Sequence, residues 1–206
     1  MKVLVVTGTP GTGKTTLSVK LAKKLDFCYI DVNKIVEKYA LSEGYDRKRK
    51  TKVVDVKKLN RALIKEIGNY KKLIQSTINK YPMIKQNLII NSNPKIQSNK
   101  NKKQKKPIEK MKNNKEIKRG IIIDSHLSHY LPKKYVDLCI VVKCSLKELE
   151  RRVKKKKYPK DKIRENLDAE IFDICLNEAK ETKHKVVVVD TTKGINIDKI
   201  KSMVKW

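Results

Sequence analysis

The chain has 206 residues and a mass of 23.9 kDa, the length of one large domain or two small ones. Its 51 Lys and Arg residues against 22 Asp and Glu give a net charge of +29, but 39% of the residues are hydrophobic, which excludes a fully disordered chain. No apolar run approaches the roughly 18–20 residues that span a bilayer, and the N-terminus lacks a secretion signal's apolar core, so we expect a cytoplasmic protein without a membrane partner.

The N-terminal third predicts a strand, a glycine-rich loop and several helices. Residues 2–7 are apolar and β-branched, residues 8–13 form turns, and residues 14–25 carry leucines at helical spacing. Asp31 or Asn33 and then Asp55 precede helical patterns that they would cap. The elements expected next are an extended segment at 27–30, a helix near 33–41, a loop at 44–46 and a helix at 56–68.

Strands and helices alternate again after residue 120. Ser145 followed by Glu148 is a capping-box pattern at the start of a helix that ends near residue 156. The other elements expected are strands at 121–124, 138–143 and 186–189, and helices at 161–182 and 197–205. Wholly apolar strands that alternate with helices predict an α/β fold with a parallel sheet covered on both faces.

Residues 69–119 do not fit this alternation, because connections between elements are typically only a few residues long. Residues 70–81 remain compatible with a helix. Between Lys95 and Arg119 there are ten Lys and one Arg against two Glu, a net charge of +9, and Asn and Gln fill most of the gaps. This composition buries too little apolar surface to fold, so we predict an insertion at 69–118 that is flexible over 91–118. Without residues 95–119 the net charge is still +20, so this basic stretch is not the main source of charge.

The basic residues themselves are mostly lysines, 44 Lys against 7 Arg. A protein that reads nucleic-acid bases usually carries more Arg, because the guanidinium matches base edges and phosphates bidentately. The charge therefore has two interpretations, a general Lys-rich composition or a surface that binds polyanions, and both stay open.

The cysteines and histidines form no pattern of a metal site along the chain. No C-x-x-C pair occurs, and the histidines do not complete a zinc motif. We expect reduced thiols, mostly in the core, and assign no role to His129. The residues are Cys28, Cys139, Cys144 and Cys175, with His126, His129 and His184.

Residues 8–15 match the phosphate-binding motif G-x-x-x-x-G-K-[ST] at every fixed position. A strand precedes the motif and a helix follows it, which is the context that the motif needs. Glycines allow backbone N–H groups to wrap phosphates, and the helix N-terminus favours their negative charge. Lys14 would reach the β- and γ-phosphates of ATP, Thr15 would ligate Mg²⁺, and Thr16 would contact the α-phosphate.

A second motif lies at 121–124, where an apolar strand ends in Asp124. A carboxylate at this place would hold a water bound to Mg²⁺ beside the phosphates. His126 follows two residues later and would contact phosphate, orient a water or transfer a proton. Alternatively, His126 is a loop histidine without a role.

These segments together resemble the adenylate kinase isoenzyme 6 family, and its archaeal members most. The resemblance rests on GTPGTGKTT at 8–16, YIDV at 29–32, GYD at 44–46, VVD at 53–55, IIIDSH at 121–126 and ENLDAEIFD at 165–173. It implies a P-loop NTPase fold, a doubly wound five-stranded parallel sheet with a short NMP-binding region and a lid. It also implies transfer of the ATP γ-phosphoryl group to AMP or other monophosphates, ATPase activity, and a role in maturation of the small ribosomal subunit.

The resemblance further implies where the parts lie in a single domain over 1–206. The NMP-binding region would fall at 31–54 and the lid at 155–165. Lys14, Asp124, His126 and Lys156 would be catalytic, with Mg²⁺ held at Thr15 and Asp124. Expected ATP contacts are Gly8, Gly11, Gly13, Lys14, Thr15, Thr16, Lys156, Thr192 and Lys193, and expected acceptor contacts are Asp31, Lys34, Lys38, Arg47 and Asp55. Expected partners are a small-subunit ribosomal protein and rRNA, the latter through the basic surface or the insertion.

Two departures from the family pattern affect this prediction. The lid of the family carries Arg-Gly-Tyr, whereas this chain has Lys156, Lys157 and Tyr158. Lys acts as a point charge where Arg would clamp a phosphoryl group, and loss of the glycine stiffens the turn. No Arg precedes Tyr45, so Lys34, Lys38, Arg47 or Arg49 would have to bind the acceptor phosphate.

Two alternatives to a kinase of this type remain. In the first, the protein is mainly an assembly factor that uses ATP to switch its binding to a ribosomal protein or rRNA. In the second, it is another small P-loop kinase that acts on shikimate or a nucleoside. The GYD and DSH segments disfavour the second alternative.

Overall fold

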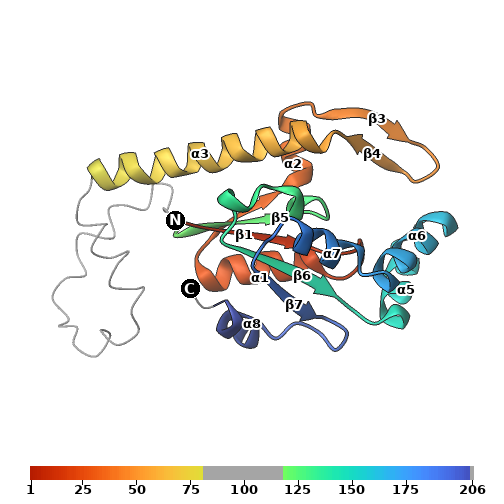
Figure 1. The fold of residues 1–206 in the computed structure, drawn as a ribbon. Helices are drawn as coiled ribbons and strands as arrows, with labels where there is room; N and C mark the ends of the chain where they lie inside the picture. The colour runs from red at the N-terminus through yellow and green to blue at the C-terminus, as the bar shows by residue number, and fades with distance from the viewer. Residues whose placement is uncertain (81–117, 205–206) are drawn as a thin grey trace.

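The computed structural model describes residues 1–80 and 118–204, and its core is a five-stranded sheet (Figure 1). The strand order is β2-β5-β1-β6-β7, and every pairing is parallel. β1, β5 and β6 are buried along almost their whole length, as apolar strands covered on both faces must be. The predicted α/β class with a five-stranded parallel sheet is confirmed. The strands are β1 (Lys2–Thr7), β2 (Cys28–Asp31), β5 (Gly120–Asp124), β6 (Leu138–Lys143) and β7 (Val186–Asp190).

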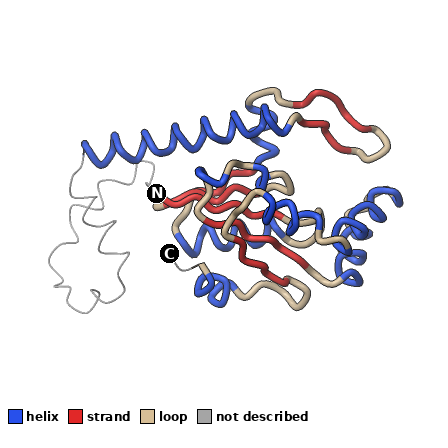
Figure 2. Tube along the Cα trace, viewed as in Figure 1, coloured by secondary structure: helices blue, strands red, loops and turns tan. Residues whose placement is uncertain are grey.

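Helices cover both faces of this sheet (Figure 2). On one face, Leu17 and Leu21 of α1 (Lys14–Leu25) and Ile200 of α8 (Ile197–Met203) pack against Leu4. On the other face pack α2 (Val32–Lys38), α3 (Val56–Lys80) and α7 (Ile174–Glu181). Alternate residues of β1 pack on the two faces of the sheet. Because β1 is the central strand, the loop that follows it lies at the middle of the sheet's carboxyl edge.

A hairpin of β3 (Ser42–Asp46) and β4 (Thr51–Val54) forms a separate two-stranded antiparallel sheet that projects from the body beside α2 and α3 (Figure 1). The loop expected at 44–46 is wrong, because Gly44, Tyr45 and Asp46 are strand residues paired with β4. The helix expected at 33–41 ends at Lys38.

The helix expected at 161–182 is also wrong, because two helices occupy this range. α5 (Leu146–Lys155) packs on α6 (Lys160–Ile171), whereas α7 packs on β6. Between α6 and α7, Asp173 has a left-handed backbone with φ of 54°, and its carboxylate pairs with Lys143 at the end of β6. Asp tolerates this conformation better than most residues, so the chain turns there while the apolar period continues.

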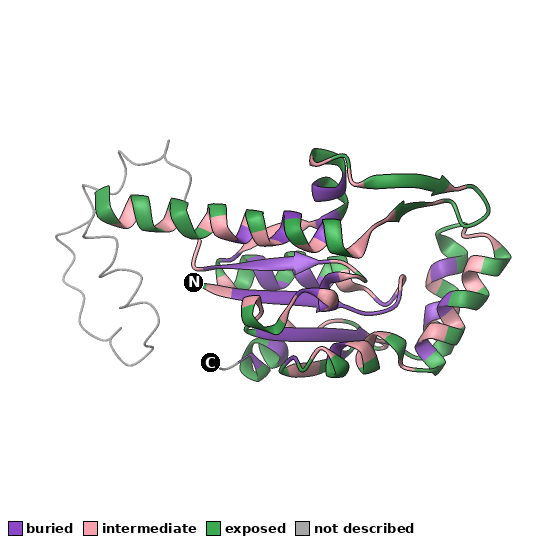
Figure 3. Cartoon of the chain, turned by 45° about the horizontal axis from the view of Figure 1, so that its top comes forward, coloured by how far each residue is buried: buried purple, intermediate pink, exposed green. Residues whose placement is uncertain are grey.

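α3 is longer than the predicted helix at 56–68 and runs to Lys80. Its buried residues, Leu59, Ala62, Leu63 and Ile67, all lie in its first half, and the second half extends beyond the sheet without burial (Figure 3). The insertion expected at 69–118 therefore begins inside a helix, and most of the range predicted to be flexible, 91–118, lies outside the described residues. No helix in the described ranges is long and apolar enough to cross a membrane.

Candidate functional site

The loop between β1 and α1 has the backbone of a phosphate cradle. Gly8, Gly11 and Gly13 have positive φ angles of 136°, 106° and 99°, which side-chain-bearing residues rarely adopt. A Cβ on Gly8 would lie 2.2 Å from the carbonyl oxygen of Val142, and one on Gly11 would lie 2.7 Å from Val153 Cγ1. Only glycine therefore fits at these two positions.

Lys14 is the first residue of α1, and its side chain folds over the loop. Its Nζ donates a hydrogen bond to the carbonyl oxygen of Thr9 at 3.0 Å, and the N–H of Thr12 donates to the same oxygen at 3.2 Å. Removal from water lowers the pKa of Lys14 to about 8, and the nearby carboxylate of Asp124 opposes that shift. The ammonium group is therefore poorly solvated and ready to accept a phosphate as its counterion.

Asp124 ends β5 at the carboxyl edge of the sheet and is 6% exposed. Its Oδ2 accepts a hydrogen bond from the hydroxyl of Tyr29 at 3.1 Å. Burial and this carboxylate raise the pKa of Tyr29, which therefore stays a neutral donor. Asp124 and Thr15 line the same cavity and offer the oxygen ligands that Mg²⁺ prefers, so these residues fit a magnesium ion.

The cavity that these residues share has a volume of about 900 Å³, enough for a nucleotide. Its lining includes one carboxylate, Asp124, and six cationic side chains. Three predicted ATP contacts at its loop, Gly11, Gly13 and Thr16, also line it, whereas Gly8 lies behind them. The six cations are Lys14, Lys20, Arg151, Arg152, Lys155 and Lys156.

Four of these cations come from the C-terminal half of α5 and the turn after it, and only Lys156 was predicted from the sequence. Ser145 caps α5 by accepting from the N–H of Glu148 at 3.4 Å, as the capping box predicted. With the helix start fixed, its 3.6-residue period would have placed Arg151, Arg152 and Lys155 near one face.

Arg152 joins three parts of the site. Its guanidinium donates to the carbonyl oxygens of Thr12 at 3.1 Å and Thr191 at 2.7 Å, and its Nε donates to Glu148 at 2.6 Å. The Thr191 hydroxyl donates to Thr12 as well. The phosphate loop, α5 and the loop after β7 are thus held together by one side chain.

Two residues expected to contact ATP, Thr192 and Lys193, lie beside the cavity instead of lining it. The N–H of Thr192 donates to Asp190 at 2.6 Å, and its hydroxyl accepts from the N–H of Ser145 at 2.8 Å. Neither Thr192 nor Lys193 is among the lining residues, which from this loop are Thr191, Gly194 and Ile195. The loop after β7 therefore borders the cavity, but its turn directs Thr191, Gly194 and Ile195 toward the cavity instead of Thr192 and Lys193.

The residues expected to bind the acceptor do not line the cavity either, and three of them have structural roles. Asp31 accepts from the N–H of Asn33 at 2.9 Å and Asp55 from that of Lys57 at 2.6 Å, so both cap helices. Lys38 pairs with Glu66 at 2.6 Å. The two remaining candidates, Lys34 and Arg47, are exposed outside it, whereas Asn33 lines it.

Arg49 connects the hairpin to α6. Its Nε donates to both carboxylate oxygens of Glu165, at 2.9 and 3.0 Å, and its NH1 donates to Asp46 at 2.8 Å. Lys48 pairs with Asp161 at 3.0 Å beside it. The expected NMP-binding and lid segments therefore touch across the site, and Arg49 is already paired with carboxylates.

The segment expected to form the lid contains a tight turn between α5 and α6. Lys156 lies at the end of α5 and lines the cavity together with Tyr158. Lys157 has a left-handed backbone with φ of 55°, at the position where the family pattern has glycine.

His126 lies in the same cavity but keeps contact with solvent. Partial removal from water and then the positive charge of Lys14 lower its pKa. The ring is therefore neutral near pH 7, where it can orient a water or a phosphate oxygen through a hydrogen bond.

Comparisons with known proteins agree with this geometry. The family model described as "AAA domain" matches residues 4–173. A protein of Methanocaldococcus jannaschii named "Putative adenylate kinase" is 30% identical over 92% of this chain and 76% of its own length, and an "Adenylate kinase isoenzyme 6 homolog" of Caenorhabditis elegans is 26% identical over 90% and 76%. A solved deoxyadenosine kinase from M. mycoides is 16% identical, covers 99% of both chains and has a TM-score of 0.46. The family match and the archaeal relative show that the chain belongs to the AAA-domain family and, within it, to the adenylate kinase group that the isoenzyme 6 homologs share.

Proposed function

We propose that the protein is a nucleoside monophosphate kinase that transfers the γ-phosphoryl group of ATP to AMP or a related monophosphate. The observation that carries the proposal is the single cavity in which a phosphate loop, a buried carboxylate and six cations meet. Such a site is suited to a highly charged phosphate substrate, and the names of the relatives add the reaction class.

Phosphoryl transfer asks the protein mainly to position the reactants and to neutralise charge. Lys14 and the N–H groups of the glycine loop would hold the β- and γ-phosphates of ATP. Lys155 and Lys156 would neutralise the transferred group from the lid side. A Mg²⁺ ion held by Thr15 and Asp124 would supply further charge neutralisation when bound.

The acceptor would lie on the α2 side of the cavity, where Asn33 and His126 line it. His126 is neutral near pH 7 and would orient the acceptor phosphate without adding charge. Arg49, by holding the hairpin against α6, would position this side of the site instead of binding phosphate itself.

ATP hydrolysis is the second part of the proposal. Only four residues, 156–159, separate α5 from α6, so the lid turn is short. A short lid excludes water less completely, and water then competes with the acceptor for the γ-phosphoryl group.

The test is a screen of monophosphates with ATP and Mg²⁺, in which the base-labelled acceptor is followed into the diphosphate. We expect acceptor-dependent transfer that Lys14→Ala and Asp124→Asn each reduce by at least about 100-fold, because the first removes a positive charge from the phosphates and the second removes the carboxylate that would hold Mg²⁺. Lys147→Ala, an exposed lysine of α5 outside the cavity, serves as the charge-matched control. A folded, Mg²⁺-loaded protein that labels no diphosphate with any acceptor would refute the kinase.

A second candidate function is ATP-dependent maturation of the small ribosomal subunit, with a ribosomal protein or rRNA as partner. The net charge of +29 and the exposed lysines of the second half of α3, Lys71 and Lys72, favour it. Binding to rRNA should weaken steeply as salt rises, since phosphate contacts release counterions. Equal binding at about 50 and 200 mM salt would argue against this partner.

A further inference from the structure

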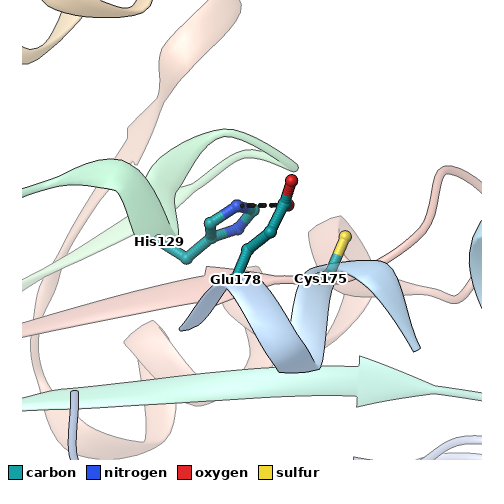
Figure 4. Close-up of side chains that lie close together, drawn as sticks. All are labelled: His129, Cys175 and Glu178. Carbon is teal, nitrogen blue, oxygen red and sulfur yellow. Dashed lines mark ion pairs between the residues drawn. The ribbon is translucent and has the colours of Figure 1, made fainter. Parts of the chain in front are cut away.

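Behind the phosphate loop, three side chains from separate parts of the chain converge (Figure 4). They are His129 of the 3₁₀ turn η3 (Ser128–Tyr130), and Cys175 and Glu178 of α7. One ligand atom from each lies within 4.8 Å of the other two, and this is the one such group found among the described residues. None of the three lines the nucleotide cavity.

The nitrogen His129 Nε2 is aimed into this group without a well-aligned hydrogen bond. His129 is 1% exposed, and its Nε2 lies 2.9 Å from Glu178 Oε2, yet no hydrogen bond of good geometry reaches that nitrogen. Burial is the main cause that lowers the pKa of His129. The imidazole nitrogen, the carboxylate oxygen and the thiol sulfur are three electron-pair donors that can coordinate one cation together.

Two of the three side chains also have a hydrogen bond that orients them and leaves one ligand atom available. Thr7 Oγ1 lies 2.6 Å from His129 Nδ1, which fixes the ring and, with the proton on Nδ1, leaves Nε2 as a ligand atom. The hydroxyl of Tyr130 donates to Glu178 Oε1 at 2.6 Å, which leaves Oε2. Such outer hydrogen bonds are the usual support of metal ligands.

The third ligand, Cys175, lies partly buried in α7. Burial raises the pKa of its thiol, and the positive charge of Lys14 opposes that rise. A metal would displace the thiol proton to solvent and take the thiolate.

We propose that His129, Cys175 and Glu178 form a binding site for one borderline-soft divalent cation, best matched by Zn²⁺, separate from the magnesium site. The nitrogen, sulfur and oxygen set suits Zn²⁺ and excludes Mg²⁺, which takes oxygen ligands. Zinc bond lengths imply ligand atoms roughly 3.3–3.7 Å apart, so His129 Nε2 and Glu178 Oε2, now 2.9 Å apart, would separate slightly and the thiol would move closer to them. Thr7, which contacts His129, is the last residue of β1 before the phosphate loop, so the cation would brace the start of that loop from behind.

The test uses the full-length, metal-free protein without nucleotide and Co²⁺ as the first probe. One Co²⁺ per chain should bind with a thiolate-to-cobalt charge-transfer band in the near ultraviolet, and one equivalent of Zn²⁺ should displace it. Cys175→Ser should lose the band, whereas Cys28→Ser, another partly buried cysteine outside the group, should keep it. Tyr130→Phe should keep the band and weaken Zn²⁺ binding by about tenfold or more.

A folded wild-type protein without the band, or a band that survives Cys175→Ser, would overturn the proposal. If Cys175→Ser fails to fold, Glu178→Gln replaces it, because an amide oxygen is a poor zinc ligand. Zn²⁺ affinity that is unchanged in folded Glu178→Gln would then count against the site. These readouts measure metal binding alone, so they do not depend on the kinase activity.

Discussion

Lys14 is the residue on which the site's electrostatics depend most. Its pKa of about 8 in the free protein means that its charge is present below about pH 8 and lost above it. Phosphate binding needs that charge and would itself raise the pKa.

We therefore expect kcat/KM for ATP to be flat near pH 7 and to fall above about pH 8, since this ratio reports the free enzyme. Lys14→Arg, whose guanidinium stays protonated, should lose the alkaline fall even if its rate is lower. The measurement is kcat/KM for ATP against pH in both proteins. A wild-type profile that stays flat to about pH 9 would show that Lys14 is not the titrating group.

Glu170 is a buried carboxylate that ties α6 to the phosphate loop. Its Oε2 accepts from the Thr9 hydroxyl at 2.5 Å, and its Oε1 accepts from the N–H of Cys144 at 3.1 Å. The residue is 7% exposed, so its removal leaves two buried donors without an acceptor.

Glu170→Ala should lower the free energy of unfolding by about 2–4 kcal/mol, measured by urea denaturation. Glu181→Ala, at the exposed end of α7, is the matched control and should cost less than about 0.5 kcal/mol. Equal losses in the two variants would remove Glu170 from this role.

Lys157 carries backbone strain in the lid turn. Its φ of 55° is costly for a residue with a Cβ, by roughly 1–2 kcal/mol, and glycine avoids this cost while giving up about 0.5–1 kcal/mol of chain entropy. Lys157→Gly should thus raise the free energy of unfolding by about 0.5–1 kcal/mol. Lys154→Gly, inside α5, should instead lower it by about 1 kcal/mol. A lower free energy of unfolding in both variants would show that the backbone at Lys157 is not strained.

At the scale of elements, the β3–β4 hairpin contacts α6 through polar side chains. Arg49, Glu165 and Lys162 take part, and since Arg49 and Glu165 are exposed and Lys162 is only half-buried, each pair contributes little on its own. In the proposed kinase this contact would hold the acceptor side closed.

Glu165→Gln should raise KM for the acceptor about two- to fivefold with little change in KM for ATP, because exposed pairs contribute up to about 1 kcal/mol. Glu150→Gln removes a comparable exposed pair within α5, that of Glu150 with Lys154, and is the control. A uniform change in both KM values would indicate general damage instead of lost closure.

The elements that the sequence predicted well are those whose local pattern and burial agree. The apolar strands, the α1 helix and the cap of α5 follow from period and motif alone. The hairpin was missed because Gly44-Tyr45-Asp46 has turn composition, and only pairing with β4 makes it a strand. The break at Asp173 was missed because its partner, Lys143, lies 30 residues away in sequence.

The same limit applies to the site. Its phosphate loop and Asp124 lie in short motifs, so the sequence identifies them directly. The helical period groups the cations of α5, but that they face the cavity, and that His129, Cys175 and Glu178 meet, depends on how helices pack, which no local pattern encodes.

At the scale of the whole molecule, the chain leaves and re-enters the core at one point. The hydroxyl of Tyr70 in α3 donates to the carbonyl oxygen of Lys118 at 3.2 Å and accepts from its N–H at 3.1 Å. Tyr70 and Lys118 thus lie beside each other, so a short connection can replace the sequence between them.

A variant with 71–117 replaced by about four Gly and Ser residues should fold and keep phosphoryl transfer within about twofold, since such a linker spans the gap. Its net charge falls by 11, so binding to RNA should weaken if the segment contacts it. Loss of transfer in a folded variant would show that the segment belongs to the kinase.

In the proposed function, the cavity passes the γ-phosphoryl group to a monophosphate in preference to water. The direct measurement uses ATP labelled in its γ-phosphate together with AMP and Mg²⁺, and follows how the label divides between ADP and inorganic phosphate. The structure predicts that most of the label reaches ADP at saturating AMP and that Lys14→Ala abolishes both products. Label that appears only in inorganic phosphate, at a rate that AMP does not change, would contradict it.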